Sequence, residues 1–183
     1  MGRIANERGF VLKHPLSYTG GPATVLPVVN VALVMLVLAT PAAVAANTTV
    51  SFELDGPQIT ANPSTGATIK TTGAGSFDPS ANTVVASGSF TEFNANGSVA
   101  ARGTWVATSF VSFTPFGGPN PGTQGGTLQI TVTLFSGGAS QTGVPMTVDC
   151  LVNAPPTFTG AEGITIGDFT NSVRGHTLFH LNQ

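Results

Sequence analysis

Charged side chains are scarce in this chain, and few of them are basic. Lys, Arg, Asp and Glu make up 8% of the 183 residues, against about a quarter in ordinary soluble domains. Residues 47–183 carry three basic and seven acidic side chains, a formal net charge of −4. A nucleic-acid-binding protein needs a basic stripe to displace counterions from phosphates, so we exclude nucleic acid as a partner.

Cysteine is also nearly absent, because Cys150 is the only one. A single cysteine forms no internal disulfide and supplies no cluster for zinc. The chain also lacks the Gly-x-Ser-x-Gly, Gly-x-Gly-x-x-Gly and His-Glu-x-x-His motifs of hydrolase nucleophiles, dinucleotide sites and zinc proteases. From these absences we predict no cofactor, no metal site and no catalytic residue.

Hydroxyl-bearing and apolar residues are plentiful by contrast. Residues 47–183 contain 23 Thr and 12 Ser, while 41% of the whole chain is hydrophobic and includes twelve Phe. Thr is β-branched and fits a half-buried pleated surface. The composition therefore favours a β-sheet protein with enough apolar side chains to build a core.

Residues 1–46 have the composition of a secretory leader. Three basic residues, Arg3, Arg8 and Lys13, precede an unbroken apolar run at Val31–Ala39. Small residues then provide a cleavage site after Ala45 or Ala46. We predict an N-terminal hydrophobic signal helix, followed by an exported domain over residues 47–183 that is secreted or held in the cell envelope.

An uncleaved single-pass signal anchor is the alternative. The stretch Val25–Ala46 is 22 residues long and would cross about 30 Å of hydrocarbon. However, Pro27, Asn30 and Pro41 interrupt it, and the next basic residue is Lys70. In this alternative the protein would contact the membrane only through the N-terminal segment.

Residues 125–152 alternate apolar and polar side chains with a period of two. Leu128, Ile130, Val132 and Leu134 alternate with polar residues, and a second alternating run extends from Val144 to Val152. The glycine-rich linker between the two runs predicts a hairpin. In this register Cys150 faces the core.

Six further segments have the same strand-like pattern, and turn residues separate nearly all of them. They are Thr48–Leu54, Ala67–Thr72, Thr83–Phe93, Val99–Phe113, Gly163–Phe169 and Val173–Leu181. No segment after Ala46 has a sustained helical stripe of apolar residues. We therefore predict an all-β domain, either an antiparallel β-barrel or a β-sandwich of about eight strands.

The single tryptophan, Trp105, lies on a strand among small residues. Alternation places it on one face with Val99, Ala101, Gly103, Ala107, Val111 and Phe113. Small neighbours around a bulky ring indicate a core tryptophan. The functional alternative is a barrel of about eight strands with room for one small apolar ligand. Its ligand-binding residues would be Trp105, Phe90 and Phe113.

The acidic and histidine residues give weak indications of chemistry. Glu53 and Asp55 would lie about 6.6 Å apart on one strand face, a separation that a glycosidase pair also uses. His176 and His180 would lie about 13 Å apart on the last strand, too far to chelate one metal. We expect both histidines on the solvated face and Phe179 on the core face.

Together these observations predict a secreted or envelope-associated, non-catalytic β-sheet module with a structural or binding role. Its partner would be a protein or a small apolar ligand. Two alternatives stay open: a closed β-barrel that binds an apolar ligand beside Trp105, and a small enzyme of barrel or sandwich fold that uses Glu53 and Asp55.

Overall fold

The computed structural model describes residues 49–182, so the expected signal helix lies outside the described residues. The described chain forms one antiparallel sheet of ten strands and contains no helix, which confirms the all-β prediction. Over this range there is accordingly no helix that could cross a membrane.

The ten strands follow one another along the chain with short turns between most of them. They are β1 (Thr49–Leu54), β2 (Gln58–Ala61), β3 (Thr68–Asp78), β4 (Thr83–Phe93), β5 (Val99–Gly117), β6 (Thr123–Ser136), β7 (Ala139–Cys150), β8 (Gly163–Ile166), β9 (Asn171–Arg174) and β10 (Thr177–Asn182).

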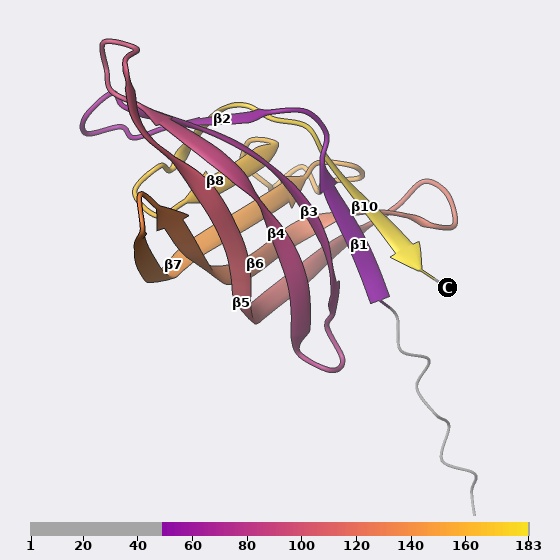
Figure 1. Ribbon diagram of the computed structural model, residues 1–183. Helices are drawn as coiled ribbons and strands as arrows, with labels where there is room; N and C mark the ends of the chain where they lie inside the picture. Colours follow the sequence, from indigo (N-terminus) through magenta and orange to yellow (C-terminus); the bar gives the residue numbers. More distant parts are fainter. Residues whose placement is uncertain (1–48, 183) are drawn as a thin grey trace, which may run out of the picture. The chain divides into compact units, whose positions relative to one another are not determined.

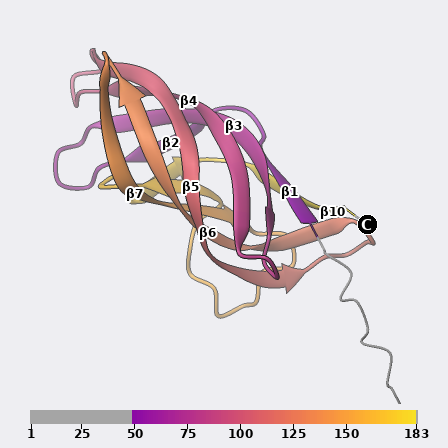
Figure 2. The same ribbon diagram turned by 60° about the horizontal axis from the view of Figure 1, so that its bottom comes forward.

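The long strands β3 to β7 each pair with the next strand along the chain. Figures 1 and 2 show β3, β4 and β5 as long curved strands that run side by side. The first strand, β1, pairs with β3 on one side and with the last strand, β10, on the other. Because β10 also pairs with β6, the pairings run β1–β10–β6–β5–β4–β3 and return to β1.

The remaining strands extend this circuit of pairings. β7 continues from β6 and pairs with β8, while β2 continues from β3 and pairs with β9. A buried hydrogen bond links the two extensions, because the Thr60 hydroxyl on β2 donates to the Ile164 carbonyl on β8 at 2.8 Å.

Five phenylalanines gather in one part of the core. The ring of Phe77 has its centroid 4.8 Å from that of Phe113, 5.9 Å from Phe110, 6.0 Å from Phe179 and 6.4 Å from Phe52. We call this group the Phe cluster. Phe52, Phe77 and Phe179 are almost completely buried, so these rings supply much of the apolar burial.

Trp105 fills a different part of the core, against glycines. Its side chain is fully buried, and its indole N–H donates to the Thr72 carbonyl at 3.0 Å. A Cβ at Gly73 or Gly88 would overlap the indole ring. The ring therefore occupies space that two neighbouring strands leave free, and Trp105 is a core residue, as its small flanking residues predict.

The structure has ten strands rather than about eight, for two reasons. No pattern in the sequence predicted β2, because this strand has only four residues and lies between Pro57 and Pro63. The expected strand Val173–Leu181 is split into β9 and β10. It breaks at Gly175, where a Cβ would overlap the Cα of Gly163 and the side-chain oxygen of Gln58.

Alternation predicted which side chains of β5 face the core. This prediction is correct for Trp105 at the centre of the strand and wrong for Val99 and Val111. Val99 is 45% exposed and Val111 is 56% exposed, whereas Trp105 is buried. The register against β6 shifts near residues 108 and 111, so simple alternation fails there. Bulges of this kind place an extra residue in one strand and bend it. The bend in β5 is visible in Figure 1.

Candidate functional site

A hollow of about 290 Å³ lies where the ends of several strands meet. Its large apolar lining residues are Ile69, Phe90, Leu134, Val144, Ile166 and Phe169, and the small Ala67 lies at its edge. Its polar lining consists of Asn62, Thr65, Glu92, Gln141 and Asp168. Four of the apolar residues are buried and three of the polar residues are exposed, so the hollow has an apolar floor and a polar rim. We call it the Phe90 hollow.

Two tight turns hold the rim in place. In the turn between β2 and β3, the Asn62 side chain accepts hydrogen bonds from the backbone N–H groups of Ser64 and Thr65 at 2.9 and 3.2 Å. Such Asx turns are typical of loops that begin with Asn. In the second turn, Ile166 and Phe169 exchange two backbone hydrogen bonds of 3.0 Å, and Asp168 lies between them.

Glu92 lies on the inner face of the sheet, where the neighbouring residues are apolar. It is opposite Ile69 on β3 and opposite Ala101 on β5. It is two residues from Phe90, so both side chains belong to the same face of β4. Within residues 49–182 neither Glu92 nor Asp168 forms an ion pair. The hollow therefore contains two uncompensated carboxylates beside apolar side chains.

A second, shallower hollow of about 220 Å³ adjoins the first. It shares Phe90, Glu92, Leu134 and Gln141 with the Phe90 hollow and continues toward the hairpin between β6 and β7. The two hollows together form a longer groove beside the last residues of β4 and β6 and the first residues of β7.

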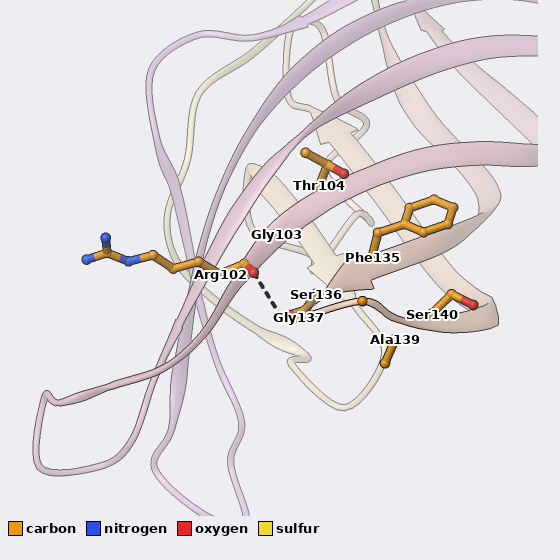
Figure 3. A pocket seen from close by; sticks show the side chains of 9 residues that line it. Arg102, Gly103, Thr104, Phe135, Ser136, Gly137, Ala139 and Ser140 are labelled. Atoms are coloured by element: carbon orange, nitrogen blue, oxygen red, sulfur yellow. Dashed lines mark hydrogen bonds between the residues drawn. The ribbon is translucent and has the colours of Figure 1, made fainter.

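A third, more open hollow also borders the hairpin between β6 and β7 (Figure 3). The Ser136 hydroxyl donates to the Arg102 carbonyl at 2.8 Å, which ties the hairpin to β5. Figure 3 shows the Arg102 side chain pointing away from the other labelled side chains. The hollow therefore offers Phe135 and small polar groups to a ligand but no convergent charge.

The three predicted ligand-binding residues do not share one hollow. Phe90 lines the Phe90 hollow, whereas Trp105 is packed against glycines and lines none of the hollows described here. Phe113 belongs to the Phe cluster and borders a separate hollow of about 300 Å³ near Asp78. Sequence reasoning missed Glu92 and Asp168. Glu92 could have been found, because it is two residues from Phe90 on one strand and therefore shares its face.

Asp55 and His176 form an exposed hydrogen-bonded cluster with Glu162 nearby, while Glu53 is not part of it. The His176 Nδ1 atom lies 3.0 Å from the Asp55 carboxylate, and its Nε2 atom lies 3.8 Å from Glu162. Asp55 follows the end of β1, and His176 precedes β10, so both are loop residues. The cluster joins three loops, and both ring nitrogens face carboxylates rather than a hydroxyl or thiol nucleophile.

Two carboxyl groups outside the hollow have shifted pKa values. Burial raises the pKa of Asp149, and the hydrogen bond that its carboxylate accepts from Thr127 at 2.6 Å partly opposes this. The pKa of Asp78 is lowered, chiefly because its carboxylate accepts a hydrogen bond from the Ser80 hydroxyl at 2.6 Å. Asp78 closes the turn between β3 and β4, so its role is structural.

Residues 49–182 contain no group of three or more His, Cys, Asp or Glu side chains arranged to hold a metal. Comparisons with protein-family models, with curated proteins and with solved structures give no match to this chain. Function is therefore argued from the geometry of the Phe90 hollow.

Proposed function

We propose that this protein is an exported, non-catalytic β-sheet module that binds a small ligand with an apolar body in the Phe90 hollow. The observation that carries the proposal is the combination of an apolar floor with a polar rim in a hollow of about 290 Å³. Small-molecule sites are typically concave and mostly apolar, with a few placed polar groups.

The second part of the proposal concerns the sheet. We propose that the circuit of six paired strands is a closed barrel rather than a sandwich. The two-sided pairing of β1 supports this, because a sandwich leaves its sheets with free edges. The interior is then filled by Trp105 and the Phe cluster, and the ligand occupies the end of the barrel rather than its centre.

A neutral fluorescent probe, N-phenyl-1-naphthylamine, tests whether the hollow binds ligands. We expect a saturable rise in its emission with the wild-type protein. Ala67 is half-buried at the edge of the hollow, so Ala67→Trp is expected to fill the space and abolish the signal. The matched control is Ala81→Trp, in the exposed turn between β3 and β4. Equal binding by both variants and the wild-type protein would disprove the proposed site.

Export is tested separately, by mass spectrometry of the protein recovered from culture medium and cell fractions. We expect a mature N-terminus at Ala46 or Asn47, because small residues precede both positions. An intact chain in the membrane fraction would support the signal-anchor alternative, and an intact chain in the cytosol would contradict export altogether.

The enzyme alternative receives less support from the geometry. Asp55 is engaged with His176, and the other predicted carboxylate, Glu53, is an exposed residue of β1. Neither residue lines the Phe90 hollow. A catalytic role for this pair would require a substrate at the exposed end of β1, where water has free access.

A further inference from the structure

We infer that the ligand of the Phe90 hollow is a small amphiphilic cation, such as an amine with an apolar tail. This inference rests on the proposed function and adds the charge of the ligand to it. The position of the two carboxylates, the distribution of basic residues and the aromatic lining all favour such a ligand.

The position of Glu92 is the first argument. An acidic side chain on the inner face of a sheet is costly unless it is hydrated or paired. Glu92 is half-buried between two apolar neighbours, Ile69 and Ala101, and has no ion-pair partner within the described residues. A ligand cation beside Glu92 would compensate this charge, whereas a neutral ligand would displace its water without replacing it.

Asp168 adds a second negative charge from another direction. It lies in the short turn after β8, which backbone hydrogen bonds between Ile166 and Phe169 hold in place. Both Asp168 and Glu92 line the hollow, although they come from different strands and loops. A ligand head group in the hollow would therefore experience a negative electrostatic potential from both carboxylates.

Basic residues on the two strands that flank β4 are directed to the opposite face of the sheet from Glu92. Lys70 and Arg102 both lie opposite Thr91 in the sheet register, one position away from Glu92. Neither residue lines the Phe90 hollow, and both are exposed. The local field is thus not cancelled, which favours a cation and repels a carboxylate or phosphate.

The lining determines the rest of the ligand. Six apolar side chains provide a floor for a hydrocarbon or aromatic body. Two of them, Phe90 and Phe169, are aromatic, and aromatic rings attract alkylammonium groups. The adjoining hollow of about 220 Å³ gives room for a longer tail. These features together describe a monocation with an apolar tail.

Octylammonium, octanol and octanoate provide the test, because they share one tail and differ in head-group charge. Each is used to displace N-phenyl-1-naphthylamine from the wild-type protein. We expect octylammonium to bind about tenfold more tightly than octanol, and octanoate to bind more weakly than both, from one ion pair and one cation–π contact. The advantage of octylammonium should shrink at high salt.

Two variants identify the source of the preference. Glu92→Gln and Asp168→Asn are each expected to reduce the advantage of octylammonium, while octanol binding stays nearly unchanged. The matched control is Glu53→Gln, which removes an exposed acid of β1 outside the hollow and should leave the advantage intact. Asp168 is on an exposed turn, so this variant decides the matter if the Glu92 variant does not fold.

The outcomes separate this inference from the function on which it rests. Equal affinity for octylammonium and octanol, or an advantage that survives in the variants, would overturn the cation preference and leave the hollow as a binding site. Failure of all three compounds to displace the probe, or failure of the probe to bind, would overturn both.

Discussion

The Phe cluster and the Phe90 hollow lie at two ends of one core. The first is closely packed, whereas the second leaves open space. In the Phe cluster, six pairs among the five rings have centroids 4.8–6.4 Å apart, and three of the rings are almost completely buried. In the hollow, the aromatic and aliphatic side chains meet a polar rim and leave about 290 Å³ open.

The difference between these regions shows where this fold gains stability and where it keeps space for a ligand. Close packing of large rings stabilises the first region, because each buried ring removes a large apolar area from water. The second region carries a carboxylate on its inner face, which contributes nothing to a packed core. Three substitutions test this contrast, from the largest expected effect to the smallest, and a fourth tests a partly buried carboxyl group outside both regions.

Phe77→Ala removes the ring that contacts all the other members of the Phe cluster. We expect a loss of about 3–5 kcal/mol in the free energy of unfolding, since a buried Phe leaves a cavity that its neighbours only partly fill. Urea denaturation followed by circular dichroism measures this loss. A loss below about 1 kcal/mol would mean that the cluster does not dominate the stability of the core.

Gly88→Ala tests the packing between the two ends, where Trp105 lies on glycine. The new Cβ would overlap the Thr72 carbonyl oxygen and lie against the indole nitrogen. We expect a loss of about 1–3 kcal/mol in unfolding free energy, because overpacking forces backbone or ring to move. Ser87→Ala, on the exposed neighbouring residue, is the control and should change stability by less than about 0.5 kcal/mol.

Phe169→Ala makes at the hollow the same truncation that Phe77→Ala makes in the cluster. Phe169 is only half-buried, so we expect a loss of about 1 kcal/mol in unfolding free energy. Binding of the neutral naphthylamine probe should weaken at the same time. A stability loss equal to that of Phe77→Ala would remove the contrast between the two regions.

Asp149→Asn should have the smallest effect, and it should depend on pH. The raised pKa of Asp149 means that the folded state holds a proton more firmly than the unfolded state. Its contribution to stability is therefore greatest at low pH and falls as pH rises from about 3.8 through the folded pKa. We therefore expect the free energy of unfolding of the Asn variant to rise relative to that of the wild-type protein over this range, in urea titrations from pH 3 to 7. A difference that does not change with pH would contradict the raised pKa of Asp149.

Sequence alternation predicted the strands that have one wet and one buried face. β4 occupies the predicted range, and the pattern of β6 placed Leu128, Ile130 and Val132 in the core. Prediction failed where local geometry departs from alternation. The register shifts in β5 exposed Val111, and the close approach of Gly175 to Gly163 divided the last expected strand.

The candidate site was only partly predictable, because it is formed by residues far apart in the chain. Phe90 was predicted to bind a ligand together with Trp105 and Phe113, but the three rings lie in different parts of the core and only Phe90 lines the hollow. The turn that carries Asp168 and the turn that carries Asn62 meet at the hollow through pairings that the sequence does not encode locally. By contrast, Glu92 is two residues from Phe90 on one strand, so simple alternation would have placed both side chains on one face.

The pairing of β1 with β10 affects the order in which the chain can fold. Thr49 lies opposite Asn182, so the circuit of strands joins only when both ends of the segment 49–182 are available. Closing such a long loop is slow compared with forming a local hairpin. A nascent chain would therefore remain incompletely folded until β10 emerges, which is the condition in which a polypeptide can still be threaded across a membrane.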